Sequence, residues 1–198
     1  FQYAADFSEG LAAVGYRGYV GYIDAKGEWS IPYGYDEGHA FHCGMAWTNG
    51  NAGPGFIDRF GLRVTGSAIE KHSDCQGGMA RVKVNGSYGF LHASGRMLIA
   101  ARFESVSDFH EGFAAADKDS TYIDRTGTAV YDQLVPLTPF SNGKAVANKR
   151  VGGATKHVVL SNDGSYEIIR HEISRTDSVE FSPFSEGLTA MTLGSGAG

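Results

Sequence analysis

Long apolar runs, basic clusters and helical periodicity are all missing from this chain of 198 residues. No apolar run approaches the roughly 18 residues that a membrane-spanning helix needs, so the sequence predicts no membrane span. The formal net charge is −5 and no run of lysines or arginines offsets it, which argues against nucleic acid as a partner. Without a helical period, strands are the expected main element.

The usual signatures of catalysis are also absent from the sequence. There is no G-x-S-x-G nucleophile motif, no H-E-x-x-H metal motif and no glycine-rich loop that would bind phosphate. The chain is 42% hydrophobic and 20% charged, which is the composition of a folded protein. We therefore expect no enzymatic activity and no cofactor. A hydrolase whose site is built from loops of several repeats is the less favoured alternative.

Glycine, by contrast, is abundant, and its positions reveal an internal repeat. The motif Phe-x-x-Gly, or a variant of it, starts near residues 7, 41, 75, 109, 140 and 184. Its glycines stand at positions 10, 44, 78, 112, 143 and 187, so the first three intervals are each 34 residues. A fixed period of this size is typical of repeat architectures. We predict one tandem-repeat domain over residues 1–193, followed by a linker-like Gly/Ser tail at 194–198.

A second motif follows each first one and has the chemistry of a hairpin turn. It consists of an apolar pair, an Asp, two variable residues and a Gly, as in residues 22–27 and 56–61. An Asp side chain can accept hydrogen bonds from amides two residues further on, and Gly supplies the positive φ. This turn explains the recurring Asp24, Asp58 and Asp124 better than acid–base chemistry or metal binding does, because His92 stands at the same place in another copy.

The spacing of the two motifs predicts an all-β fold of antiparallel hairpins or meanders. Each repeat of about 34 residues contains a first strand, a hairpin, a third strand and a short strand before the next Phe. Two arrangements could bury such units, a propeller-like curved array and an open β-solenoid. The extra pieces at both ends do not fit a closed ring of five, but they would fit a six-membered ring that lacks one hairpin or a segment of a longer array. We favour the propeller-like array over the solenoid.

The chain resembles the bacterial WG (or KWG) repeat family. The resemblance rests on Phe-x-Glu-Gly-x-Ala-x-Val, Gly-Tyr-Ile-Asp-x-x-Gly and a closing Ile-Pro, all present in residues 7–32. The tryptophan that names the family is replaced by Val20, Pro54 and Tyr88, which makes this chain a divergent member. The resemblance implies tandem β-repeats that act as interaction modules within larger bacterial proteins and have no activity of their own.

The two cysteines, Cys43 and Cys75, are too few for a disulfide framework. They lie in adjacent repeats but two residues out of register, so we expect unpaired thiols, with one bridge in an oxidising compartment as the alternative. His39, His42 and Cys43 form the tightest group of metal-capable residues, but their spacing matches no zinc motif and we expect no metal. The chain begins in mid-repeat, so we expect a piece of a longer protein, and its compartment is not predicted.

Residues that vary between copies of the first strand are candidates for binding, because packing does not fix them. Trp47 and Arg81 are the outliers three residues after the turn glycine, and both types are common interface anchors. Neighbouring loops add the remaining candidates, Tyr16, Arg17, Tyr19 and Lys83. The alternative is that Trp47 simply fills the core.

We expect these residues to contact a protein partner. A carbohydrate, or another small ligand, stacked on Trp47 and Tyr19 is the alternative partner. Several equivalent weak sites would favour a sugar and one asymmetric patch favours a protein. The aromatic residues are not repeated at the loop positions, which favours the protein.

Overall fold

The chain is all-β in the computed structural model, with nineteen strands and no helix among the residues that the structure describes. These are residues 1–65, 69–117, 121–131, 133–169, 178–185 and 191–194. The predicted all-β class of antiparallel strands is thereby confirmed. The chain divides into two compact units, Phe1–Arg102 and Phe103–Gly198, which are described separately. Gly187 of the last motif and the tail at 195–198 lie outside the described residues, and the single domain over 1–193 stays a prediction.

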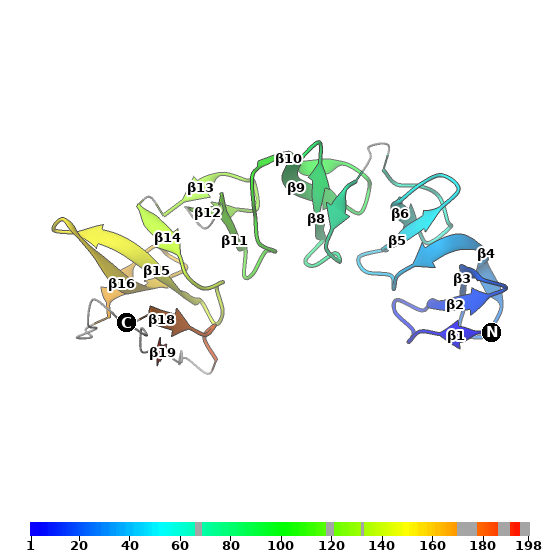
Figure 1. Cartoon of the computed structure of the whole chain (residues 1–198), viewed down its shortest axis with the longest axis horizontal. Helices are drawn as coiled ribbons and strands as arrows, with labels where there is room; N and C mark the ends of the chain where they lie inside the picture. The colour runs from blue at the N-terminus through cyan, green and yellow to red at the C-terminus, as the bar shows by residue number, and fades with distance from the viewer. Residues whose placement is uncertain (66–68, 118–120, 132, 170–177, 186–190, 195–198) are drawn as a thin grey trace. The chain divides into compact units, whose positions relative to one another are not determined.

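The first unit contains two antiparallel sheets (Figure 1). The six-stranded sheet has the order β1-β2-β3-β4-β5-β6, and the four-stranded sheet has the order β10-β9-β8-β7. The strands are β1 (Tyr3–Ala4), β2 (Ala12–Tyr16), β3 (Tyr19–Ile23), β4 (Trp29–Gly38), β5 (Met45–Gly50), β6 (Gly55–Asp58), β7 (Lys71–His72), β8 (Met79–Val84), β9 (Ser87–His92) and β10 (Met97–Phe103).

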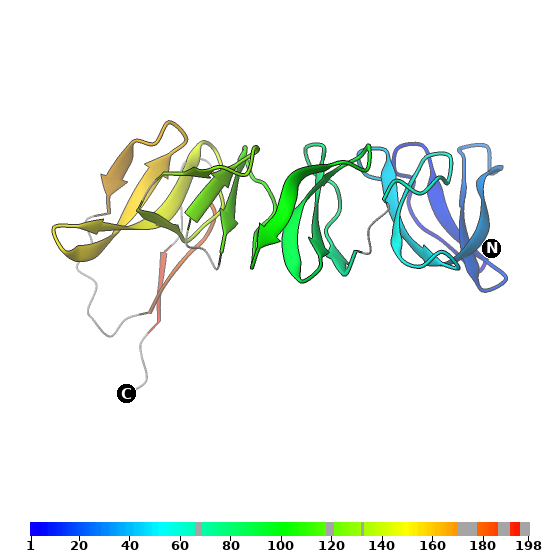
Figure 2. The same ribbon diagram turned by 90° about the horizontal axis from the view of Figure 1, so that it is seen from above.

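The described residues of the second unit form three antiparallel sheets, which Figure 2 shows from a second side. Their orders are β11-β12-β13, β14-β15-β16-β17 and β18-β19. The strands are β11 (Phe113–Ala116), β12 (Thr121–Asp124), β13 (Ala129–Val130), β14 (Leu134–Pro136), β15 (Lys144–Val151), β16 (Ala154–Ser161), β17 (Tyr166–Ile168), β18 (Ser178–Phe181) and β19 (Met191–Gly194).

One repeat is a meander in which each strand pairs with its neighbours in sequence. We number the repeats 1 to 6 by their turn glycines at positions 10, 44, 78, 112, 143 and 187. In repeat 1 the short strand β1 pairs with β2, β2 with β3, and β3 with β4. The far end of β4 then pairs with β5, so β4 is both the third strand of repeat 1 and the short strand of repeat 2. This order agrees with the predicted unit.

The Phe-x-x-Gly motif forms a two-residue turn of type I′. Ser8 and Leu11 bridge across the turn, and Glu9 and Gly10 both have positive φ, 53° and 81°. Positive φ at both central residues defines type I′, the turn whose twist matches that of paired strands. The same left-handed residue before the turn glycine recurs in the later described copies as Cys43, Gly77, Glu111 and Asn142.

The Asp-x-x-Gly turns have the predicted hydrogen bonds. The Asp24 Oδ1 atom accepts from the amides of Lys26 and Glu28 at 2.9 and 3.0 Å, and Gly27 has a φ of 83°. Asp58 and Asp124 make the same pairs of bonds. These carboxylates therefore hold hairpins together, as the sequence predicted.

The core of a repeat is completed by the phenylalanine of the repeat that follows it. Phe41, from the turn of repeat 2, is fully buried in a cluster with Leu11, Tyr22 and Ile31 of repeat 1. Phe140 of repeat 5 is 2% exposed, in a cluster with residues of repeat 4 such as Tyr122. A buried aromatic side chain contributes strongly to the hydrophobic stabilisation of a core. Repeats 1 and 2, and repeats 4 and 5, are therefore joined through their interiors, and repeats 1 and 2 also share strand β4.

A buried tyrosine adds a hydrogen bond at two of these joints. Tyr22 is fully buried, and its hydroxyl donates to the His39 carbonyl of repeat 2 at 2.9 Å. Tyr122 is 1% exposed and donates to the Thr138 carbonyl of repeat 5 at 2.8 Å. Burial raises the pKa of Tyr22, so its hydroxyl remains a donor at any physiological pH.

Candidate functional site

The type I′ turns of successive repeats are linked by the side chain that precedes the turn glycine. The Glu9 carboxylate accepts from the Gly44 amide at 2.8 Å. Glu111 repeats the arrangement in the second unit, where its two oxygens accept from the amides of Asn142 and Gly143 at 2.7 Å each. Hydrogen bonds to an ionised acceptor are stronger than neutral ones. This glutamate therefore fastens one turn to the next.

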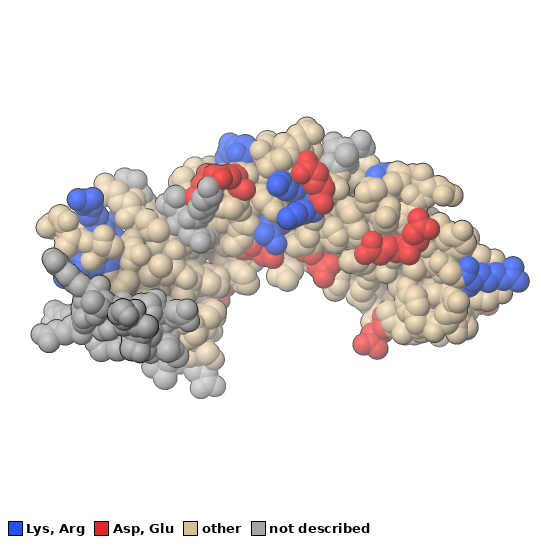
Figure 3. All heavy atoms as spheres, in the orientation of Figure 1, with Lys and Arg blue, Asp and Glu red and all other residues tan. Residues whose placement is uncertain are grey.

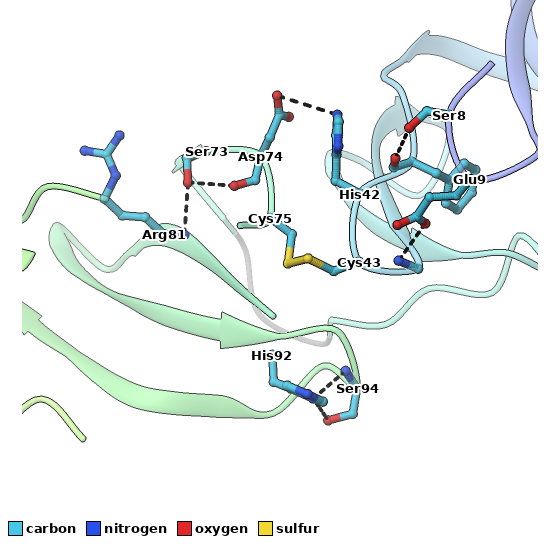
Figure 4. The surroundings of a disulfide bond; sticks show 12 residues. Ser8, Glu9, His42, Cys43, Ser73, Asp74, Cys75, Arg81, His92 and Ser94 are labelled. Atoms are coloured by element: carbon cyan, nitrogen blue, oxygen red, sulfur yellow. Dashed lines mark hydrogen bonds and ion pairs between the residues drawn. A yellow bond between two sulfur atoms is a disulfide. The ribbon is translucent and has the colours of Figure 1, made fainter. Parts of the chain in front are cut away.

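Repeat 2 replaces the glutamate with Cys43, and here the link is covalent. Cys43 and Cys75 form a disulfide with their Cα atoms 5.8 Å apart, and it joins the turns of repeats 2 and 3 (Figure 4). The expectation of unpaired thiols was wrong. Cys75 stands at the Phe position of its motif, which lies in the core of the preceding repeat and so next to the preceding turn. The two-residue offset therefore brings the thiols together.

The disulfide also bears on the metal candidates, because Cys43 and Cys75 are bonded to each other instead of being free to bind an ion. The Nε2 atom of His39 lies 2.8 Å from Glu37, and that of His42 lies 4.0 Å from Asp74. Within the described ranges, no three His, Cys, Asp or Glu side chains are placed to hold a metal ion. The contacts of His39 with Glu37 and of His42 with Asp74 need no metal ion to account for them.

Trp47 lies in the core of repeat 2. Its side chain is 8% exposed, and its ring stacks on His72 with centroids 3.9 Å apart and contacts Phe56 edge to face. The alternative in which Trp47 fills the core therefore fits the structure, because too little of the ring is exposed for it to contact a partner at the surface. Its substitution would disturb the core before it tested binding.

Arg81 and Lys83 lie together on β8, separate from the other candidates. The guanidinium of Arg81 and the ammonium of Lys83 are 5.9 and 5.4 Å from the centroid of the Tyr88 ring on β9. Cation–π contacts at half-exposed sites are worth about 0.5–1 kcal/mol. These two cations therefore form a small basic group around one tyrosine.

The remaining candidates belong to a cluster of aromatic rings on repeat 1. Tyr16, at the end of β2, contacts three other rings, with centroids 6.5 Å from Phe1, 6.1 Å from Trp29 and 4.8 Å from Tyr33. Arg17 lies in the hairpin turn, with its guanidinium 5.3 Å from the Tyr16 centroid. Tyr16 is half-buried, while the other three rings are 37–65% exposed. We call these five residues the aromatic face.

Two further features give the aromatic face its form. A Cβ atom on Gly21 would lie 2.7 Å from the Trp29 ring, so only glycine lets the indole lie against β3. Tyr19, across the hairpin from Tyr16, is 46% exposed and extends the aromatic surface. Tyr16, Arg17 and Tyr19 were predicted from the sequence as binding residues, whereas Trp29 and Tyr33 were not. Trp29 could have been found from its position two residues after Gly27 of the Asp-x-x-Gly turn, because the residue at this position differs between repeats.

The other described repeats do not carry the same cluster. The residues equivalent to Tyr16 and Trp29 are Gly50 and Arg63 in repeat 2, Val84 and Met97 in repeat 3, and Lys149 and Tyr166 in repeat 5. Arg63 donates to backbone carbonyls, whereas Val84 and Met97 pack on the core. In repeat 5 the Lys149 ammonium lies 4.8 Å from the Tyr166 centroid. The aromatic face is therefore a feature of repeat 1 in the described part of the chain.

Charged side chains do not form one dominant patch on the face that Figure 3 shows. Lysines and arginines occur in small separate groups, and aspartates and glutamates lie among them. Such a mixed surface gives little long-range attraction for a strongly charged partner. Aromatic contact area is therefore the more distinctive property of this chain.

Acid is expected to destabilise the fold through His72. Burial lowers the pKa of His72 below its ordinary value of 6.5, and the nearby His39 lowers it further. The unfolded chain therefore binds more protons than the folded chain once the pH falls below about 6.5, and the free energy of unfolding falls with it. We expect urea midpoints to drop between pH 7.5 and 5.5. His72→Gln should flatten this dependence, with His110→Gln as the control, and an equal slope in parent and His72→Gln would refute the assignment.

Comparison with known families identifies the repeat. Residues 21–49 and 88–122 match the family model described as "WG containing repeat". These two segments of the chain are similar to the WG repeat. Each matched segment begins at the second strand of one repeat and ends on a strand of the next. Residues 21–49 include the Asp24 turn and the Phe41 turn, and residues 88–122 include the His92 turn and the Phe109 turn. The resemblance predicted from the sequence is confirmed.

A search among curated proteins found no match to the chain. In the described part of the chain, no helix has the length and apolar character needed to cross a membrane.

Proposed function

We propose that this chain is a non-catalytic WG-repeat module that binds a protein partner through the aromatic face of repeat 1. The observation that carries the proposal is the gathering of Phe1, Tyr16, Trp29 and Tyr33, with Arg17 beside them, on one repeat. Trp, Tyr and Arg are the residue types that dominate binding energy at protein interfaces. One asymmetric patch on a repetitive scaffold favours a single docking site.

The arrangement of the rings favours a protein over a sugar. Neighbouring rings meet at interplanar angles between 54° and 86°, so the edge of one ring covers part of the face of another. A pyranose stacks best on one open, flat ring, whereas a protein side chain can fit against edges and hydroxyls. Binding of a carbohydrate is the second candidate because Tyr19 and Trp29 remain 46% and 38% exposed.

The proposal is tested by removing the two rings at the centre of the face. Trp29→Ala/Tyr33→Ala is expected to lower the affinity for the partner by roughly 1,000-fold, because each lost anchor contributes about 2 kcal/mol, or roughly 30-fold. The partner is first captured from an extract of the source cell with the parent chain, then purified and measured by calorimetry. The control is Phe60→Ala/Leu62→Ala, which removes two side chains that are 84% and 64% exposed on repeat 2.

Three outcomes are distinguishable in this experiment. Loss of binding in the first variant alone supports the aromatic face as the site. Equal binding by all three proteins refutes it. Binding of a glycan array by the parent, abolished by Trp29→Ala/Tyr33→Ala, would replace the protein partner with a carbohydrate.

We also propose that the repeats form a propeller-like curved array within a larger bacterial protein, with no catalytic role. The shared strand β4 supports this proposal, because a strand common to two meanders fixes the turn of repeat 2 relative to repeat 1. Small-angle scattering of the whole chain would distinguish this arrangement from an open solenoid.

A further inference from the structure

A pocket lies beside the β5–β6 hairpin of repeat 2. It has a volume of about 240 Å³, and its lining includes the side chains of Tyr35, Ile57 and Arg63 and the backbone of Gly50. Most of the lining is apolar, and an engineered apolar cavity of about 150 Å³ is already large enough to bind benzene. None of the lining residues belongs to the aromatic face, so the pocket is a separate site.

The open end of the β5–β6 hairpin follows from a proline. In repeat 1 the pairing of the equivalent strands continues to Tyr16 and Tyr19, whereas in repeat 2 it stops at Thr48 and Gly55. Pro54, just before Gly55, has no amide hydrogen and cannot extend the ladder. The chain therefore forms a loop there instead of a tight turn, and this loop lines one side of the pocket.

Comparison with repeat 1 shows which side chain the pocket lacks. In repeat 1 the Tyr16 ring contacts Phe1 and Trp29, with centroids 6.5 and 6.1 Å away. The residues equivalent to Tyr16, Phe1 and Trp29, counted from the turn glycine, are Gly50, Tyr35 and Arg63. All three line the pocket. The place that a phenol ring fills in repeat 1 therefore corresponds to the pocket of repeat 2.

Arg63 gives the pocket a fixed cation. Its Nη1 atom donates to the Ala52 and Gly53 carbonyls at 3.0 and 2.9 Å, and its Nε atom donates to the Thr65 carbonyl at 3.2 Å. Its Nη2 atom donates to the Pro54 carbonyl. These acceptors are neutral, and within the described ranges no carboxylate forms an ion pair with Arg63. The guanidinium is therefore held in place without a carboxylate to neutralise its charge.

The same two positions in repeat 5 show which group complements a cation there. The Lys149 ammonium lies 4.8 Å from the Tyr166 centroid. These residues stand at the positions of Gly50 and Arg63, respectively. The two positions thus hold a cation and a ring in repeat 5 and two rings in repeat 1, but a cation alone in repeat 2. An aromatic ring would complete repeat 2, because the face of a ring attracts a guanidinium.

We propose that the pocket of repeat 2 binds the side chain of a tyrosine from a protein partner. The phenol ring takes the place that Tyr16 has in repeat 1, against the Arg63 guanidinium and the apolar lining. Burial of the ring supplies most of the affinity, and the cation favours an aromatic ring over an aliphatic side chain. A tyrosine of the chain itself fills this place in repeat 1, which is why a side chain is the expected occupant. The pocket and the aromatic face use different residues, so either proposal can fail alone.

The test uses N-acetyl-tyrosinamide as the probe and follows its binding to the whole chain by NMR titration. A dissociation constant on the order of 1 mM is expected for a ligand of this size. Gly50→Tyr should weaken binding at least tenfold, because the new side chain fills the pocket, and Gly50 does not have a positive φ that would exclude one. Lys149→Tyr is the matched control, since it places the same side chain at the equivalent position of repeat 5, and it should bind the probe as the parent does.

Two further measurements need no substitution in the chain. N-acetyl-cyclohexylalaninamide, which has an aliphatic ring, should bind roughly 2- to 5-fold more weakly than the tyrosine probe, which is the value of an exposed cation–π contact. Nuclear Overhauser effects between the ring of the tyrosine probe and the Ile57 methyl groups should place that ring in the pocket.

The outcomes that would overturn the proposal are specific. Unchanged binding by Gly50→Tyr, or no Overhauser effect between the probe and Ile57, would show that the ring does not enter the pocket. Equal affinity for the cyclohexyl analogue would refute the contact with Arg63. Binding of free 4-methylphenol without binding of N-acetyl-tyrosinamide would replace the tyrosine side chain with a free phenol as the occupant.

Discussion

Removing the Cys43–Cys75 disulfide is expected to lower the free energy of unfolding of the first unit by roughly 3–4 kcal/mol. The bridge spans a sequence separation of 32 residues. Cross-linking a loop of this length restricts the unfolded chain by about that amount in the chain-entropy model. The variant Cys43→Ala/Cys75→Ala, measured by urea unfolding, should therefore lose a large part of the stability that a domain of this size has.

The same variant supplies the control for a reductant. Adding a dithiol to the parent chain should shift its urea midpoint to that of the variant, while the variant itself should not respond. A parent chain whose midpoint is unchanged when mass spectrometry shows both thiols reduced would contradict the prediction.

Phe41→Ala is expected to be the most damaging single substitution in the first unit, at about 3–5 kcal/mol of stability. The ring is fully buried and completes the core of repeat 1 from repeat 2, so its loss weakens two repeats at once. Urea unfolding followed by tryptophan fluorescence suits this measurement, because Trp29 belongs to repeat 1 and Trp47 to repeat 2.

Phe7→Ala is the matched control for this experiment, since it makes the same chemical change at the same motif position. Its side chain is 53% exposed, and the expected cost is below about 1 kcal/mol. Equal costs at the two positions would show that the motif phenylalanine acts within its own turn and not in the core of the preceding repeat.

Local turn chemistry was the part of the fold that could be predicted from the sequence. Asp24 and Gly27 lie three residues apart, and both the hydrogen bonds and the positive φ follow from their side chains alone. His92 shows how far this reasoning extends, because its Nδ1 atom accepts from the Ser94 amide at 3.1 Å in place of a carboxylate. Such features need no knowledge of distant residues.

Packing between repeats could not be predicted in this way, and Trp47 illustrates the reason. Repeat 1 combines the small Ala13 on its first strand with the large Phe41 from the next turn, whereas repeat 2 combines Trp47 with Cys75. A large side chain on the first strand thus accompanies a small one at the motif Phe position, and the reverse holds in repeat 1, so that the core is filled in both repeats. When the first strands alone were compared, Trp47 differed from its equivalents and was therefore predicted to bind a partner.

The aromatic face was found only in part for a similar reason. Tyr16, Arg17 and Tyr19 are close in sequence and share one hairpin, so a variable loop predicted them together. Trp29 and Tyr33 reach the same face from β4, and Gly21 makes room for the indole. A prediction based on one loop could not include residues that a neighbouring strand supplies.

The burial of each motif phenylalanine in the preceding repeat has a consequence for how this protein comes apart. Stability depends on contacts between nearest neighbours, so a repeat that loses its successor also loses the side chain that fills its core. Unfolding should then spread from one repeat to the next, beginning where a neighbour is missing. A deletion of one whole repeat, made between equivalent residues of two repeats, would place another repeat's phenylalanine in the core of the preceding meander. A truncation between a meander and the Phe-x-x-Gly turn that follows it would instead leave the core of that meander without its phenylalanine.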